Sequence, residues 1–193
     1  MKKCLLLIDF VNDIVSPQGK LAGAGYPAQC EKYGVLTNAS ALLETFRKAG
    51  ELVVHVRVGF SPDYKELPSA SPVLGGAKQF AALCIGSDGG EFYDKLKPTG
   101  NEAQIIKRRV SAFYGTELDV LLRNNGITEL YICGVSTDMA VQTAAREAHD
   151  RDYAVTVVGD CCAAGCETDH DTSLAFLRKI GRVVPLREIM DKM

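Results

Sequence analysis

The strongest constraint on the fold is a series of short apolar runs separated by helical stretches. The runs span residues 4–9, 51–58, 103–108, 129–135, 154–160 and 182–186. Because they are almost continuously apolar, they predict strands buried on both faces, as in a parallel sheet. Helical patterns lie near residues 31–49, 115–125, 138–151 and 167–180. The alternation predicts a doubly wound α/β fold with helices on both faces of the sheet.

The length and composition fit one folded domain. With 193 residues, of which 47% are hydrophobic, the chain can bury a single sizeable core, so one domain over residues 1–193 is predicted. The stretch from 59 to 102 is rich in Gly, Pro, Ser and Asp and is too long for an ordinary connection. We expect it either to carry a short helix around residues 77–84 or to cover a substrate site.

Charge and hydropathy indicate a small-molecule partner. The formal net charge is -2, from 22 basic and 24 acidic residues spread along the chain, which excludes a basic patch for nucleic acid. The first apolar run is interrupted at Asp9, and no segment reaches the roughly 20 apolar residues that cross a bilayer. The sequence therefore predicts a soluble protein that binds neither nucleic acid nor membrane.

The cysteines indicate a reducing compartment. There are seven, an odd number, and several lie in or beside apolar runs, which suits buried, reduced thiols and a cytoplasmic protein. Neither Cys161-Cys162 nor the spacing from Cys162 to Cys166 supplies the two ligand pairs of a zinc site. No metal and no other cofactor is expected.

Three polar features end predicted strands, where ligands bind in open parallel sheets. Asp9 follows an apolar run, so partial desolvation can raise its pKa and make it a proton donor or acceptor; a loop-fixing carboxylate is the alternative. Lys107 could hold a carboxylate and stabilise developing negative charge, or belong to an exposed basic edge. Residues 134–141, GVSTDMAV, could present backbone amides to an oxyanion or form an ordinary strand-to-helix turn.

Two other patterns carry less information. Residues 23–28, GAGYPA, match Gly-x-Gly-x-x-Ala, but they follow a polar loop and contain Pro27, which is atypical of a dinucleotide fingerprint. The histidines, His55, His149 and His170, are too widely spaced to suggest a metal pair or a Ser-His-Asp set.

Three segments together resemble the motifs of the isochorismatase-like, or cysteine hydrolase, superfamily. They are LLLIDFVND (5–13), IIKRRVSAF (105–113) and GVSTDMAVQTAAREA (134–148), and the likeness extends through DCCAAGCETDH (160–170). The resemblance implies a hydrolase with a Rossmann-like, six-stranded parallel sheet. It also implies that Asp9 and Lys107 are catalytic partners, that the Val135–Ser136 peptide is cis, that the Ser136 and Ala140 amides face the site, and that the chain forms a homodimer or homotetramer.

One departure from the family pattern affects the reaction. Amidases of the superfamily carry their nucleophilic cysteine where this chain has Ala140, and Cys133 lies inside a predicted strand, buried and inert. Three explanations remain open. The chain hydrolyses a vinyl ether or related bond without a cysteine, as isochorismatases do; it is an amide or carbamoyl hydrolase whose cysteine was replaced; or it is a non-catalytic binding protein.

The expected substrate-binding residues follow from the same resemblance. The Asp/His metal set of nicotinamidases is missing from residues 55–64, HVRVGFSPDY, which argues against nicotinamide as substrate. Instead, we expect one cation and several rings to line a pocket for a carboxylate-bearing or aromatic-like substrate. They are Arg57, Phe60, Tyr64, Phe10 and Phe113. For Phe60 and Tyr64, packing within the loop is the alternative.

Overall fold

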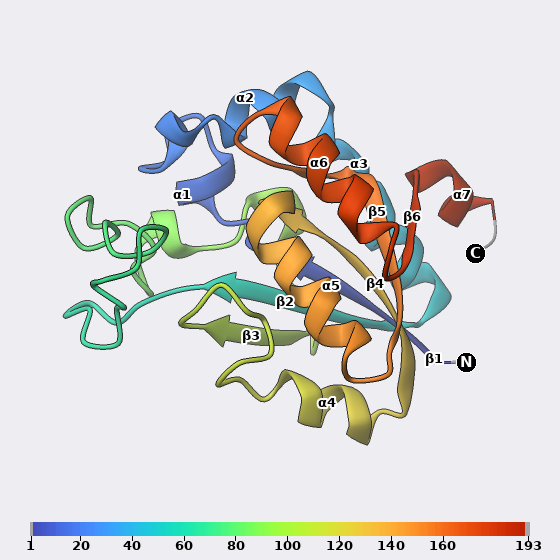
Figure 1. The fold of residues 1–193 in the computed structure, drawn as a ribbon. Helices are drawn as coiled ribbons and strands as arrows, with labels where there is room; N and C mark the ends of the chain where they lie inside the picture. Colours follow the sequence, from blue (N-terminus) through green and yellow to red (C-terminus); the bar gives the residue numbers. More distant parts are fainter. Residues whose placement is uncertain (1, 192–193) are drawn as a thin grey trace.

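The computed structural model describes residues 2–191, in which six strands form one sheet (Figure 1). The strands are β1 (Lys2–Ile8), β2 (Leu52–Val58), β3 (Ala103–Lys107), β4 (Ile127–Val135), β5 (Ala154–Ala163) and β6 (Arg182–Val184). Their order is β3-β2-β1-β4-β5-β6 and every neighbouring pair is parallel. The doubly wound, Rossmann-like sheet predicted from the apolar runs is therefore confirmed.

Helices cover both faces of the sheet (Figure 1). One face packs against α2 (Tyr26–Lys32), α3 (Val35–Ala49) and α7 (Leu186–Met190). The other packs against α4 (Leu118–Asn124), α5 (Gln142–His149) and α6 (Glu167–Leu177). Short pieces complete the structure: α1 (Asn12–Val15), the 3₁₀ turns η1 (Ala22–Ala24), η2 (Asp88–Gly90) and η3 (Asp94–Leu96), and the π-helical turn η4 (Thr137–Val141).

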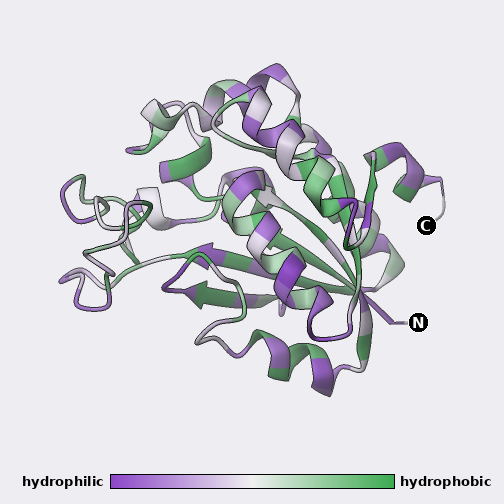
Figure 2. Ribbon diagram, in the orientation of Figure 1, coloured by the Kyte–Doolittle hydropathy of each residue, from purple (hydrophilic) through white to green (hydrophobic). Residues whose placement is uncertain are grey.

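The central strands form the core because both of their faces are covered. Residues Cys4 to Ile8 of β1 are buried, and hydrophobic residues run along the strands in Figure 2, whereas the outer helices alternate between hydrophobic and hydrophilic residues. Helix α3 illustrates the pattern: its inner face buries Leu42, Leu43 and Phe46, and Gly50 ends it in a left-handed conformation. The Gly50 N–H then bonds the Arg47 carbonyl, which would otherwise lack a partner.

Some predicted elements differ from the observed ones at their boundaries. The helix predicted over 31–49 is two helices, because Gly34 takes a left-handed conformation between α2 and α3. Residues 72–81 form successive turns and Cys84 forms a bridge with Phe60, so the short helix considered over 77–84 is wrong. The last strand ends at Val184, because Pro185 precedes the start of α7. No helix within residues 2–191 has both the length and the apolar character needed to cross a bilayer.

The connectivity locates the crevice where a ligand can bind. The chain order reverses between β1 and β4, and in such sheets ligands bind beyond the carboxyl ends of the strands at this switch point. In Figure 1 the arrowheads of β2 and β3 point toward the long loop of residues 59–102. The fold therefore brings the ends of β1, β3 and β4 to one rim, which this loop approaches.

Candidate active site

Asp9 and Lys107 form a buried ion pair at this rim. The Lys107 Nζ lies 2.8 Å from the Asp9 Oδ2, with side-chain exposures of 2% and 5%. Asp9 follows β1 and Lys107 ends β3, so the pair bridges over the end of β2, which lies between these strands. The structure thus brings together the carboxylate and the ammonium that the sequence places at separate strand ends.

The backbone holds the Asp9 carboxyl in one position. Asp9 is in a left-handed conformation with φ 59°, which is uncommon outside glycine and is found most often at functional sites. Its N–H donates to the Val56 carbonyl at 2.8 Å, and its Oδ1 accepts the Val58 N–H at 2.6 Å. Burial raises the pKa of Asp9 above its ordinary value, while the Lys107 charge and the Val58 N–H act in the opposite direction. Asp9 is therefore suited to exchange a proton.

Lys107 uses its hydrogen-bonding capacity within the protein. Besides the Asp9 carboxylate, its ammonium donates to the carbonyls of Arg109 at 3.2 Å and Val110 at 3.0 Å. An ammonium has three donors, and these three acceptors occupy them. Lys107 can orient Asp9 and supply charge, but it has no donor left for a substrate.

The turn after β4 supplies the third part of the site. Gly134 approaches β1 so closely that a Cβ there would lie 2.4 Å from the Ile8 carbonyl oxygen. The next peptide, Val135–Ser136, is cis, which confirms the expectation from the family resemblance. The π-helical turn η4 follows, closed by a bond from the Val141 N–H to the Ser136 carbonyl at 3.1 Å. Such turns occur often at functional sites.

A cavity of about 80 Å³ lies over these groups. Its polar lining consists of Asp9, Lys107, Ser136 and the ring hydroxyl of Tyr26, which interacts with Ser136. The other walls are apolar and come from four regions: Ile14 and Leu21 after β1, Val58, Val110 and Val135 at strand ends, Val73, Leu74 and Leu83 of the long loop, and Met139 and Ala140 of η4. Three side chains from residues 59–102 thus line the cavity. That this stretch covers a substrate site stays a prediction.

The residues expected to bind substrate lie elsewhere. Phe10, Arg57, Phe60, Tyr64 and Phe113 are all buried, and none lines the cavity. Arg57 donates to the Gly90 carbonyl at 2.7 Å and pairs with Glu91 at 3.0 Å.

The aromatic residues in this set have packing roles. The rings of Phe60 and Tyr64 lie 6.0 Å apart, and the Tyr64 hydroxyl donates to the Ala82 carbonyl. Phe113 stacks on Tyr153, with ring centroids 6.4 Å apart. Phe60, Tyr64 and Phe113 thus pack beneath the loop or between helices. A role of these residues in substrate binding stays a prediction.

The sequence analysis did not predict several residues of the cavity, and Tyr26 is the clearest example. It lies in the GAGYPA segment that matched a dinucleotide fingerprint. The structure gives Gly25 another purpose: a Cβ there would lie 2.3 Å from the Gly165 carbonyl oxygen, so this close approach requires glycine. The contact brings the start of α2 to the site. The glycine directly before this aromatic residue was the available signal.

Asp13 organises the walls without lining the cavity. It is 1% exposed, and its carboxylate accepts the N–H groups of Leu83 at 2.7 Å and Lys20 at 3.2 Å. Those bonds fix the segments that carry Leu21 and Leu83 into the cavity. Asn12 similarly bonds the Asp88 carbonyl. Both residues have the structural role that their turn chemistry indicates.

None of the free cysteines among residues 2–191 lines the cavity. Cys133 is fully buried in β4, and burial raises the pKa of its thiol well above the ordinary value, which suits an inert side chain. Within the same residues, no three His, Cys, Asp or Glu side chains are grouped as metal ligands.

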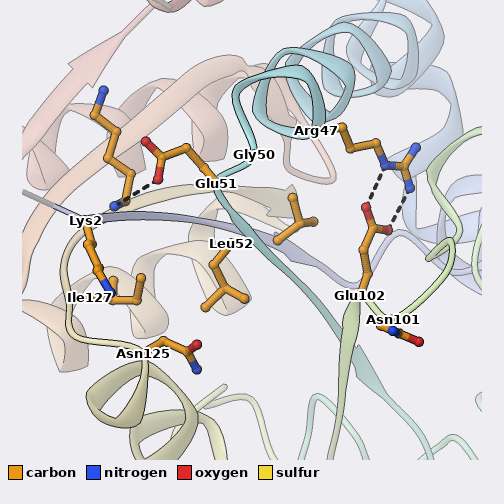
Figure 3. A pocket seen from close by; sticks show the side chains of 11 residues that line it. Lys2, Arg47, Gly50, Glu51, Leu52, Asn101, Glu102, Asn125 and Ile127 are labelled. Atoms are coloured by element: carbon orange, nitrogen blue, oxygen red, sulfur yellow. Dashed lines mark hydrogen bonds and ion pairs between the residues drawn. The ribbon is translucent and has the colours of Figure 1, made fainter.

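A larger hollow of about 620 Å³ lies at the opposite rim, by the amino ends of β1, β2 and β4 (Figure 3). Its prominent polar groups are already paired: Arg47 holds Glu102 through two bonds of 2.7 and 2.8 Å, and Glu51 accepts the Lys3 N–H. It contains neither the buried carboxyl nor the turn described above. We therefore place the reaction in the smaller cavity at the carboxyl rim.

Comparison with known proteins settles the family. Residues 3–188 match the family described as the Isochorismatase domain. The chain belongs to the isochorismatase family. An uncharacterized isochorismatase family protein of Escherichia coli O157:H7, YecD, is 32% identical over 180 residues, which cover 90% of each chain. Members of this family are hydrolases, so this chain is a hydrolase.

Two further relatives show how far the likeness extends. The maleamate amidohydrolase of Pseudomonas putida is 26% identical over 193 residues, which cover 100% of this chain and 87% of that protein. The crystal structure of an isochorismatase family protein from Desulfovibrio vulgaris matches with a TM-score of 0.86 and 27% identity, covering 98% of this chain and 97% of the other. The family fold thus spans essentially the whole chain.

Proposed function

We propose that this isochorismatase-family hydrolase cleaves a vinyl ether or a related acid-labile bond of a small molecule, without a cysteine nucleophile. One observation carries the proposal: a buried carboxyl group with a raised pKa lies at a cavity that none of the described cysteines lines. A general acid needs a proton to donate, and burial favours the protonated form of Asp9.

The proposed reaction balances with water as the only co-reactant. Protonated Asp9 donates its proton to the terminal carbon of the vinyl group, and an oxocarbenium ion forms. Water adds to the carbon that bears the ether oxygen and returns a proton to the Asp9 carboxylate. The resulting hemiacetal, or hemiketal, breaks its bond to the alcohol oxygen and yields a carbonyl compound and an alcohol. No covalent intermediate with the protein is required.

The remaining groups of the site act on Asp9 and the substrate. Lys107 holds the Asp9 carboxyl in place and balances its charge after the proton has left. Ser136 and Ala140, which line the same cavity, are proposed to bind a substrate oxygen through their backbone amides. The apolar walls limit the access of bulk water, which strengthens both interactions.

An amide or carbamoyl hydrolase with a replaced cysteine is the second candidate. The observation that favours it is the position of Ala140, which is 4% exposed and lines the cavity with Ser136. A thiol at this position would face the space above Asp9 and Lys107. The P. putida relative is named an amidohydrolase, which agrees with such a lineage.

The test compares two vinyl ethers and separates vinyl ether hydrolysis from binding alone. We expect the protein to convert isobutyl vinyl ether to acetaldehyde and isobutanol, or its anionic analogue 2-isobutoxyacrylate to pyruvate and isobutanol, as followed by proton NMR. Asp9→Asn should slow the conversion by about 10²–10⁴-fold. Failure of the unaltered protein to convert either ether would overturn the proposal. Binding without conversion in both proteins would instead favour a non-catalytic binding protein.

We further propose that the protein works in the cytoplasm as a homodimer or homotetramer. The free cysteines suit a reducing compartment, and Tyr114 and Phe176 leave apolar surface exposed for association. Size-exclusion chromatography with light scattering gives the assembly directly. A monomer at micromolar concentration would contradict the proposed homodimer or homotetramer.

A further inference from the structure

The cations near the cavity are engaged within the protein. Lys107 is the cationic side chain that lines it, and its three donors point to Asp9, Arg109 and Val110. A buried substrate carboxylate needs hydrogen-bond donors to replace its lost hydration. Lys107 offers none, because all three of its donors are already occupied.

The neighbouring cations are turned away as well. Arg57 is bound to Gly90 and Glu91 behind the wall. Arg108 pairs with Glu66 at 3.0 Å, and Arg109 donates to the Glu66 carbonyl at 2.9 Å. None of the three arginines lines the cavity.

Several carboxylates lie near the cavity without lining it. The Oδ1 of Asp138, on η4, is buried without a hydrogen-bond partner, and Asp13 is buried behind the apolar wall. Asp138 and Asp169 both lie close enough to act on the Tyr26 hydroxyl. An anion entering the cavity would lose its hydration and come under the repulsion of these nearby carboxylates.

We propose that the cavity selects a small neutral molecule with an aliphatic group next to the reacting bond, and that it rejects carboxylates. The proposal rests on the function above, because it names the substrate class of that same site. The volume of about 80 Å³ gives room for roughly five to eight non-hydrogen atoms, if about 10–15 Å³ holds one water-sized group. The side chains of Ile14, Leu21, Leu74 and Val110 match an aliphatic group, and Tyr26 and Ser136 offer hydroxyls to a neutral polar end.

The test uses two ligands of the same shape and different charge. Isovaleramide is neutral, and isovalerate is an anion at pH 7.5. Their dissociation constants are measured by NMR titration, which needs no turnover, so the result stands apart from the vinyl ether assay. We expect isovaleramide to bind at least tenfold more tightly. Equal affinity, tighter binding of isovalerate or binding of neither would overturn the proposal.

A matched pair of variants tests the cause. Val73 lines the cavity and is 53% exposed, so Val73→Lys adds a cation at the rim with little effect on folding. Val120 is 62% exposed on α4, outside the cavity, and Val120→Lys is the control. We expect the preference for isovaleramide to fall at least fivefold in Val73→Lys and to remain in Val120→Lys. An unchanged preference in Val73→Lys, or the same fall in both variants, would contradict selection by local charge.

Discussion

The Lys107 ammonium lies 2.8 Å from the Asp9 carboxylate, although β2 separates their strands in the sheet. Both side chains are buried, and the remaining donors of Lys107 bind backbone carbonyls. The pair is therefore a closed unit in which Lys107 orients Asp9, and Asp9 is the partner that can act on a substrate. Ser136 and Ala140 complete the cavity from the carboxyl end of β4, at the same rim.

Ala140→Cys should create amidase activity if the chain descends from amidases. A thiol there would line the cavity beside Asp9, which could take up its proton as the thiolate attacks an amide carbonyl. We expect ammonia release from isobutyramide, measured with a coupled assay. Ala41→Cys on α3, outside the cavity, is the control and should release none. No release from Ala140→Cys would count against the amidase lineage.

Thr137→Val should lower activity as well as stability. The Thr137 hydroxyl lies 2.8 Å from the Nδ1 of His170, and burial lowers the pKa of His170, so its neutral ring can accept this bond. Losing it costs about 0.5–1.5 kcal/mol and loosens the turn that carries Ser136 and Ala140.

We expect kcat/KM to fall by about two- to tenfold in Thr137→Val, which is that energy converted at 1.4 kcal/mol per tenfold. Thr45→Val is the matched control, because the Thr45 hydroxyl bonds the Ala41 carbonyl on α3, away from the site. A similar fall in both variants would show that the bond to His170 has no particular part in the turn.

Glu102→Gln should reduce the loss of stability in acid. Burial alone would raise the pKa of Glu102, but hydrogen bonds from Arg47, the Thr99 N–H and His55 lower it to about 2 (Figure 3 shows the Arg47 pair). The folded state therefore binds fewer protons than the unfolded state between pH 4.5 and about 2, and stability falls as the pH drops through this window.

The lowering of the Glu102 pKa on folding corresponds to up to about 3 kcal/mol of stability, at 1.36 kcal/mol per pKa unit. We expect Glu102→Gln to lose up to this amount at pH 7 and to show a shallower decline in acid, as measured by urea unfolding across pH. If the stability of Glu102→Gln fell in acid as steeply as that of the unaltered protein, other carboxylates would dominate the acid dependence.

The strands and the catalytic pair could be predicted from the sequence because both follow from short-range patterns. Continuous apolar runs mark strands covered on both faces, and the carboxyl ends of parallel strands meet at one rim. Asp9 and Lys107 therefore converge, whatever path the connections take. Helix α1 was missed because four residues are too few to show a period.

The walls of the cavity could not be predicted in the same way. They depend on the path of residues 59–102, which lack a regular period and turn through the left-handed residues Tyr64, Ala81 and Leu83. Arg57 and Phe60 are residue types that often bind substrates. Their side chains point away from the cavity, because Arg57 bonds the Gly90 carbonyl and Phe60 packs against Tyr64. Tyr26 reaches the cavity because Gly25 lies close to Gly165, a contact between residues far apart in the sequence.

The pH dependence of kcat/KM for Asp9→Asn against the unaltered protein tests the central claim most directly. Because burial raises the pKa of Asp9 and the acid form is the active one, activity should fall as the pH rises through that pKa. Asp9→Asn should lose about 10²–10⁴-fold and its residual activity should lack this decline.

The variant leaves Lys107 without its anionic partner, which costs about 3–5 kcal/mol, so the double variant Asp9→Asn/Lys107→Met controls for folding. If Asp9→Asn kept both the rate and the pH profile of the unaltered protein, Asp9 would not be the general acid.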